Sequence, residues 1–182
     1  MAARPAPTEA IPERIVVIGC AGSGKTTLAR ALAVRLGARH IERDAFGDDG
    51  APEFATQVAA AVDAAGSRWV FDGAADNAEL VVYPHADTVV ALDYPRRVVQ
   101  RRILARSARL WLTRRADGAH TYTDPPWRWW APHHPVGWVA RTHTARHAEI
   151  AELFARPELA HAHRLRSTSP RQTAVWLVSL GR

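Results

Sequence analysis

Short apolar runs alternate along the chain with stretches in which apolar residues recur at helical spacing. β-Branched runs predict buried strands at residues 14–19, 68–73 and 87–93, and weaker patterns indicate strands at 38–42 and 162–167. Helical patterns lie between them, at residues 25–37, 52–66, 96–115, 137–155 and 170–181. Strands that alternate with helices predict an α/β fold, in which helices cover both faces of a parallel sheet.

The chain has the length of one ordinary domain, with 182 residues. We expect residues 14–182 to form this domain. Residues 1–13 contain several prolines and no continuous apolar run, which indicates a flexible tail rather than a signal peptide. No stretch is apolar for the roughly 18 residues that a membrane span needs. Cys20 is the only cysteine, so no intrachain disulfide is expected and a cytoplasmic location fits.

A glycine-rich stretch, GCAGSGKTT at residues 19–27, separates the first predicted strand from the first predicted helix. It matches the P-loop pattern G-x-x-x-x-G-K-[ST]. Its glycines let successive backbone N–H groups meet phosphate oxygens, at the N-terminus of a helix that attracts the same anions. We therefore expect ATP to bind here, with Lys25 at the β- and γ-phosphates and the Thr26 hydroxyl on Mg²⁺. The expected contacts with ATP come from Gly19, Ala21, Gly22, Ser23, Gly24, Lys25, Thr26 and Thr27.

Lys25 is the only lysine among the 24 lysine and arginine residues of the chain. A planar guanidinium is a poor substitute for a compact ammonium beside the γ-phosphate, which accounts for lysine at this one position. The formal net charge of +6 favours anionic partners in general. It does not choose between nucleotides, phosphorylated metabolites and nucleic acid.

Three aspartates follow predicted strands. In an open α/β sheet, ligands bind outside the carboxyl ends of the strands, so Asp44, Asp72 and Asp93 are expected near the phosphates. We expect Asp72 to hold a water of the Mg²⁺ shell, and Asp44 to accept the proton of an acceptor hydroxyl or to orient the acceptor. For Asp93 the alternative is a structural role, as a loop or helix-cap carboxylate before Pro95.

An arginine-rich face lies on the helix predicted after the fourth strand. At about 100° per residue, Val99, Ile103 and Leu110 share an apolar stripe, and Arg102, Arg106 and Arg109 lie beside it. Guanidinium groups at this edge of the core could clamp phosphate charge, and Arg141 and Arg146 could do the same from the next helix. The alternative for each is a solvated arginine.

Tryptophan and histidine gather in DPPWRWWAPHHP, residues 124–135, where no helical or strand period is visible. The tryptophans could form a small local core, or could close over a base. His143 and His147 lie four residues apart on the following helix. They could ligate zinc together with His133 or His134. No cysteine or paired carboxylate motif supports this hypothesis.

The order of these motifs resembles the P-loop small-molecule and nucleoside monophosphate kinases. Within them it resembles the adenylate-kinase-related proteins of the DNA topology modulation group. The carriers are the P-loop, ERDAF, WVFDG, DTVVALDYP, the arginine helix and LRSTSPRQTAVWL, within residues 14–181. The resemblance implies a P-loop NTPase three-layer sandwich, with a five-stranded parallel sheet in the order 2-3-1-4-5 and a lid at about residues 111–137.

The same resemblance implies roles for three arginines. The stretch LDYP, residues 92–95, resembles the LDVP of adenylate kinases. By this likeness Arg102 and Arg106 occupy the positions of a pair of arginines on the lid helix of those enzymes. Arg141 resembles an arginine that returns from the lid. The chain departs from adenylate kinases after Asp72-Gly73, where Ala74 and Ala75 replace Phe-Pro-Arg, so AMP is a doubtful acceptor.

The sequence therefore predicts an ATP-dependent phosphotransferase of the adenylate-kinase-like type, which uses Mg²⁺ and passes the γ-phosphoryl group to a small-molecule or nucleotide acceptor. The expected catalytic residues are Lys25, Asp44, Arg102, Arg106 and Arg141, with Thr26 and Asp72 at the metal. One alternative is a nucleotide-binding regulator or slow ATPase that acts with DNA. Another is a degenerate P-loop scaffold for protein contacts.

Overall fold

The sheet of this computed structural model has five parallel strands in the order β2-β3-β1-β4-β5. The structure describes residues 11–74, 76–114 and 123–180. The strands are β1 (Arg14–Gly19), β2 (Arg39–Glu42), β3 (Trp69–Asp72), β4 (Thr88–Leu92) and β5 (His163–Ser167). The expected α/β fold and the order 2-3-1-4-5 are therefore confirmed.

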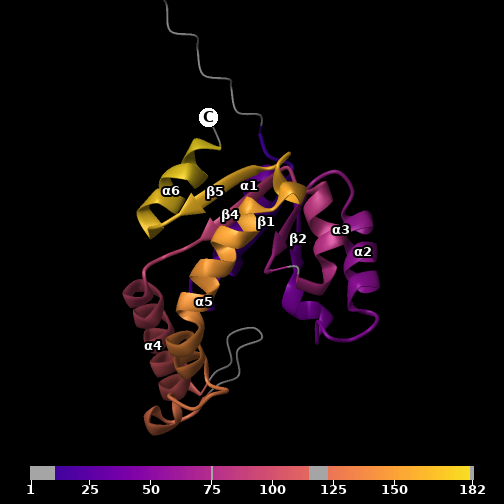
Figure 1. Ribbon diagram of the computed structural model, residues 1–182. Coiled ribbons are helices and arrows are strands. Elements are labelled where there is room, and N and C mark those ends of the chain that lie inside the picture. The colour runs from indigo at the N-terminus through magenta and orange to yellow at the C-terminus, as the bar shows by residue number, and fades with distance from the viewer. Residues whose placement is uncertain (1–10, 75, 115–122, 181–182) are drawn as a thin grey trace, which may run out of the picture.

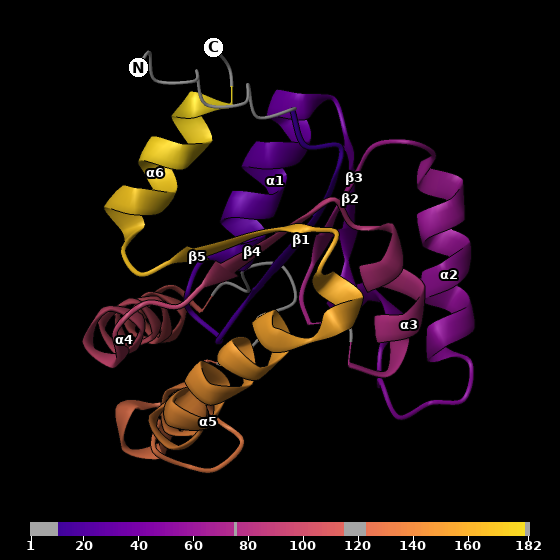
Figure 2. The ribbon, with the colours of Figure 1, turned by 45° about the horizontal axis from the view of Figure 1, so that its top comes forward.

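Helices cover both faces of the sheet (Figures 1 and 2). The helices are α1 (Lys25–Leu36), α2 (Phe54–Ala65), α3 (Glu79–Val82), α4 (Arg96–Thr113), α5 (Pro135–Ala155) and α6 (Pro170–Ser179). Successive side chains of a strand point to opposite faces. Ile15 and Val17 of β1 accordingly pack with α1 and α6, whereas Val16 and Ile18 pack with α2, α3 and the C-terminal half of α5.

The three inner strands and the two edge strands differ in burial. Every residue of β3 and β4 is buried, whereas β2 and β5 each bury only one. Strands covered on both faces appear in a sequence as continuous apolar runs. The weaker sequence patterns at residues 38–42 and 162–167 thus reflect positions at the sheet edges.

Short 3₁₀ turns connect several elements: η1 (Arg43–Phe46), η2 (Asp76–Ala78), η3 (Tyr83–His85), η4 (Pro126–Arg128) and η5 (Pro157–Leu159). The one-turn helix α3 was not predicted, because four residues show no helical period. Helix α5 begins two residues before the predicted position, since His134 caps it by accepting a hydrogen bond from the Val136 amide at 3.2 Å.

Helices α4 and α5 lie side by side and extend beyond the carboxyl end of the sheet (Figures 1 and 2). The predicted lid begins in the last turn of α4 and runs to the start of α5. Residues 115–122 of it, like residues 1–10 of the predicted tail, lie outside the described residues. Within the described part of the chain, none of the helices is long and apolar enough to cross a membrane.

Candidate active site

The P-loop leaves the carboxyl end of β1, the central strand, and enters α1 at Lys25. Gly22 and Gly24 have φ of 80° and 98°, which only glycine adopts without strain. A Cβ atom on Gly22 would also lie 2.4 Å from Ile103 Cγ1 of α4. Among the described residues, no side chain caps the N-terminus of α1, so its first N–H groups remain available to an anion.

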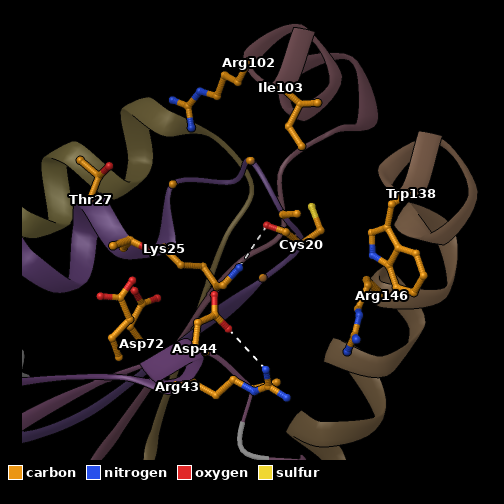
Figure 3. A pocket seen from close by; sticks show the side chains of 18 of the residues that line it. Cys20, Lys25, Thr27, Arg43, Asp44, Asp72, Arg102, Ile103, Trp138 and Arg146 are labelled. Carbon is orange, nitrogen blue, oxygen red and sulfur yellow. Dashed lines mark hydrogen bonds and ion pairs between the residues drawn. The ribbon is translucent and has the colours of Figure 1, made fainter. Parts of the chain in front are cut away.

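A cavity of about 520 Å³ opens above this loop (Figure 3). It brings together Lys25, Asp44, Asp72, Arg102 and Arg106, five of the residues expected at the site. The loop residues Gly19, Gly22, Gly24, Thr26 and Thr27 line it, together with Ala21. Ser23 is 1% exposed and does not line the cavity.

Lys25 lies at the centre of the cavity, with Nζ 3.4 Å from the Cys20 carbonyl oxygen (Figure 3). Burial lowers the pKa of its ammonium, and the nearby Asp72 carboxylate opposes that shift. Cys20 lines the same cavity, and burial raises the pKa of its thiol, as expected for an inert side chain.

Asp72 ends β3 and is 5% exposed. Burial raises the pKa of its carboxyl group, while the Thr26 hydroxyl and the Lys25 ammonium act in the opposite direction. Its Oδ2 lies 3.6 Å from His40 Nε2, and its Oδ1 has no hydrogen-bond partner of ordinary geometry among the described residues. A buried carboxylate oxygen without a partner, beside a hydroxyl, fits the expected Mg²⁺ position.

Asp44 belongs to η1, directly after β2, and its side chain is 62% exposed. Figure 3 shows it between Lys25 and Arg43. Arg43 Nη1 donates to Asp44 Oδ1 at 3.4 Å. The carboxylate thus lines the cavity and is accessible to a molecule bound in it.

Helix α4 contacts the P-loop directly. Its predicted stripe is confirmed, since Val99, Ile103 and Leu110 are buried. Arg102 Nη1 donates to the Ser23 carbonyl at 2.7 Å, and its guanidinium carbon lies 5.3 Å from the centre of the Tyr94 ring. The N-terminal half of α4 is thereby placed against the loop that would hold the phosphates.

The structure does not bring Arg141 to the cavity. Its Nη2 donates to the Pro132 carbonyl at 2.7 Å, in the segment before α5. Arg146, on the same helix, lines the cavity instead. Five residues correspond to about 140° of rotation on a helix, so these two arginines lie on different sides.

Sequence reasoning missed several lining residues, including Arg43, Asp49, Trp138 and Thr142. Arg43 adjoins Asp44, so its place after the second strand was the available signal. Trp138 and Thr142 lie one turn apart on α5. Their inward orientation follows from how α5 packs on α4 and on the sheet, which a helical period alone does not reveal.

Asp93 is buried and forms ion pairs with residues of two other elements, β5 and α5. Its Oδ2 accepts a hydrogen bond from Arg166 Nε at 2.7 Å and lies 2.6 Å from Arg166 Nη2, and its Oδ1 lies 2.8 Å from His147 Nδ1. Asp93 lies in the loop between β4 and α4 and does not line the cavity, as the loop alternative predicts, whereas the helix-cap alternative was wrong because Pro95 is the N-cap of α4. His143 Nε2 lies 2.9 Å from the Tyr94 carbonyl oxygen. Residues Asp93 and Tyr94 therefore anchor α5 to the end of β4.

The zinc interpretation is not supported. In residues 11–74, 76–114 and 123–180, no group of three or more His, Cys, Asp or Glu side chains is arranged to hold a metal ion. His134 is fully buried and stacks on Trp129, with ring centres 6.2 Å apart. Trp129 Nε1 donates to the Asp124 carbonyl at 2.7 Å. Of the nearby tryptophans, Trp129 fits the predicted local core, whereas Trp127 and Trp130 are exposed.

Comparisons with known proteins find similar solved structures but no match by sequence. No family model matches the sequence, and no curated protein matches it. The shikimate kinase from Bacteroides thetaiotaomicron superposes with a TM-score of 0.52 at 18% identity, over 93% of this chain and 96% of that one. A sugar kinase from Janibacter sp. HTCC2649 gives 0.50 at 20% identity, over 92% and 95%. A gluconokinase from Sinorhizobium meliloti 1021 gives 0.50 at 16% identity, over 94% of each chain.

The chain has the α/β fold of P-loop kinases. At these identities the likeness concerns the fold alone. The activity has to be argued from the residues in the cavity.

Proposed function

We propose that the protein is a Mg²⁺-dependent kinase that transfers the γ-phosphoryl group of ATP to a hydroxyl group of a small molecule. The observation that carries this proposal is that one cavity contains an intact P-loop with Lys25, an accessible carboxylate at Asp44, and two arginines of α4, Arg102 and Arg106. The three kinases with similar folds support the same class of reaction.

The donor phosphates would lie along the loop, where the N–H groups at the start of α1 and the Lys25 ammonium face them. Mg²⁺ would neutralise charge on the β- and γ-phosphates. Thr26 and Asp72 are the residues that would hold it, with Asp72 acting through a water molecule. Negative charge at this position would also lift the pKa of Lys25 back toward its ordinary value.

Transfer would begin when the acceptor hydroxyl gives its proton to Asp44 and its oxygen attacks the γ-phosphorus. The bond from that phosphorus to the β-phosphate oxygen breaks, and ADP leaves with the electron pair. Arg102 and Arg106 would offset charge that develops on the transferred group. Arg146 lines the cavity and Arg141 does not, so Arg146 is the arginine of α5 that could contact a substrate.

The type of kinase and its cellular location are also part of the proposal. The placement of Arg102 and Arg106 in the cavity supports an adenylate-kinase-related arrangement, and the order of the motifs resembles the DNA topology modulation group. A cytoplasmic location fits an ATP-dependent enzyme whose single cysteine is a free thiol.

The test is acceptor-dependent ADP release, measured together with MgATP binding by calorimetry. We expect Lys25→Ala to lower turnover by at least about 100-fold while the protein remains folded. Arg97→Ala, an exposed residue of α4 outside the cavity, is the matched control and should leave turnover unchanged. ADP release that no acceptor stimulates, combined with DNA binding that weakens steeply with salt, would favour the regulator instead.

A further inference from the structure

The cavity has two ends with different charge. Lys25 and Arg102 belong to the donor end, at the P-loop. Arg43 and Arg146 lie at the opposite end, where Figure 3 shows them on the far side of Lys25 from Arg102. A second cavity of about 340 Å³ shares Gly19, Ala74 and Arg146 with the first and continues it between α3 and α5. An acceptor would occupy this end.

Arg43 is already neutralised in this structure. Its Nη1 contacts Asp44 Oδ1 at 3.4 Å, and its Nη2 is paired with Asp49. Its guanidinium carbon lies 5.4 Å from the centre of the Phe54 ring, which holds the group in place. Arg43 therefore offers N–H groups to a ligand, but little net positive charge.

Arg146 and Arg156 are neutralised in the same way. Arg146 Nη1 donates to Glu149 Oε2 at 2.7 Å, and Arg156 is paired with Glu79. All four residues line the second cavity, and Glu152 adds a carboxylate there that is paired with no arginine among the described residues. Ala74, which lines both cavities, adds no charge. The acceptor end thus contains at least as many carboxylates as arginines.

This charge balance discriminates between classes of acceptor. A phosphate monoester brings a charge of about −1.5 to −2, and it binds best to arginines without carboxylate partners. Here it would have to displace Asp49 or Glu149 and then lie beside the displaced carboxylate, a like-charge contact that disfavours binding. A hydroxyl group both donates and accepts hydrogen bonds, so it can bind an arginine–carboxylate pair without separating it.

We infer that the acceptor is a polyhydroxylated molecule without an anionic group, either uncharged or bearing an amine. This inference rests on the proposed kinase function and names its substrate class. Trp138 lines the main cavity with its side chain half-exposed, and its ring provides an apolar face for the carbon skeleton and a cation–π partner for an amine. Nucleosides, sugars and amino sugars belong to this class, whereas nucleoside monophosphates and sugar acids do not.

The experiment compares acceptors that share a skeleton and differ in charge. One set is glucose, glucosamine, gluconate and glucose 6-phosphate; the other is adenosine and AMP, with ribose and glycerol as smaller neutral probes. ADP release at fixed MgATP gives kcat/KM for each compound. We expect a neutral or amino compound to exceed its anionic counterparts by at least about 10-fold, which corresponds to one arginine–carboxylate pair that must be broken.

Two variants test the cause of this preference. Asp49→Asn and Glu149→Gln keep the shape of the carboxylate and remove its charge, so each should raise the ratio of anionic to neutral kcat/KM by about 10-fold. Glu158→Gln, in η5 and outside both cavities, is the matched control and should leave the ratio unchanged.

The outcomes separate the two proposals. If AMP, gluconate or glucose 6-phosphate is the best acceptor of the wild-type protein, the inferred substrate class is wrong and the kinase function stands. A ratio that does not change in Asp49→Asn and Glu149→Gln would also overturn the charge argument. MgATP binding without stimulation by any compound would count against the kinase function itself.

Discussion

Arg102 of α4 donates a hydrogen bond to the carbonyl oxygen of Ser23 in the P-loop, over 2.7 Å. The two residues are separated by 79 positions in the sequence. The contact joins the phosphate-binding loop to the first of the two helices that flank the predicted lid. The loop and the N-terminal half of α4 are thereby held together.

The first prediction concerns Arg102. Replacing it by alanine should lower kcat by about 100-fold, because one preorganised charge at the transferred group is lost. Arg102→Lys should recover only part of the rate, since an ammonium lacks the planar fork that reaches both the carbonyl and a phosphate. Single-turnover kinetics measure the chemical step directly. Equal rates in the wild type and both variants would show that Arg102 only holds α4 in place.

A second prediction uses the two arginines of α5. Arg146→Ala should raise KM for the acceptor and lower kcat/KM by about 10-fold or more, because its side chain lines the cavity. Arg141→Ala should change kcat/KM by less than about threefold, since Arg141 bonds Pro132 outside it. Steady-state kinetics with the best acceptor decide between them. The opposite ranking would restore the role that the sequence suggested for Arg141.

Gly22 gives a prediction about stability. Gly22→Ala places a Cβ atom 2.4 Å from Ile103 Cγ1 and forces alanine to a φ of 80°, so it should cost about 2–4 kcal/mol in the free energy of unfolding. In the double variant with Ile103→Ala the clash with Ile103 disappears, so the double variant should lose less stability than the sum of the two single variants, although the backbone strain and the cost of truncating the buried Ile103 remain. Urea denaturation of the four proteins measures the coupling between the two sites. If the two changes in the free energy of unfolding are strictly additive, the Cβ atom added at Gly22 does not clash with Ile103.

Asp72 predicts a particular pH dependence. Its pKa is raised in the folded protein, so the native state binds a proton more readily than the unfolded chain does. Stability should therefore fall as the pH rises from about 3.8 through the folded pKa. Asp72→Asn lacks this titration, so its free energy of unfolding should rise relative to the wild type over the same window. Chemical denaturation from pH 4 to pH 8 without Mg²⁺ measures the difference.

The same group links pH to metal binding. Mg²⁺ requires the ionised carboxylate, so MgATP affinity should increase as the pH rises through the raised pKa of Asp72. In Asp72→Asn this part of the pH dependence should be lost. Calorimetric titrations at several pH values test it, and an unchanged pH profile in the variant would remove Asp72 from the metal site.

The ion pairs of Asp93 predict that alanine substitutions of its two partners destabilise the protein to different extents. Arg166→Ala should destabilise the protein by about 2–3 kcal/mol, because it leaves a buried carboxylate without its main partner. His147→Ala should cost less than about 1 kcal/mol, since its side chain is 57% exposed. Thermal or urea denaturation measures both. A larger loss for His147 would show that the histidine, and not the arginine, holds α5 to β4.

Local patterns in the sequence determined the elements of the sheet and the donor half of the site. The strand, loop and helix from Arg14 to Leu36 are contiguous, so a motif of a few residues contains all the geometry that the phosphates need. The buried stripe of α4 was equally local, and it correctly placed Arg102 beside the core. The strand order came from a family resemblance and not from the residues alone.

Only the tertiary structure decided the acceptor half. Arg43, Asp49, Trp138 and Arg146 come from segments up to 103 positions apart, and each segment alone allows its side chain to point to solvent. A helical period shows that Arg141 and Arg146 lie on different sides of α5, but not which side faces the cavity. That choice depends on the orientation of α5, set by His143 and His147 at the end of β4. Such contacts between distant segments leave no pattern in either segment, because the free energy of each contact depends on both side chains together.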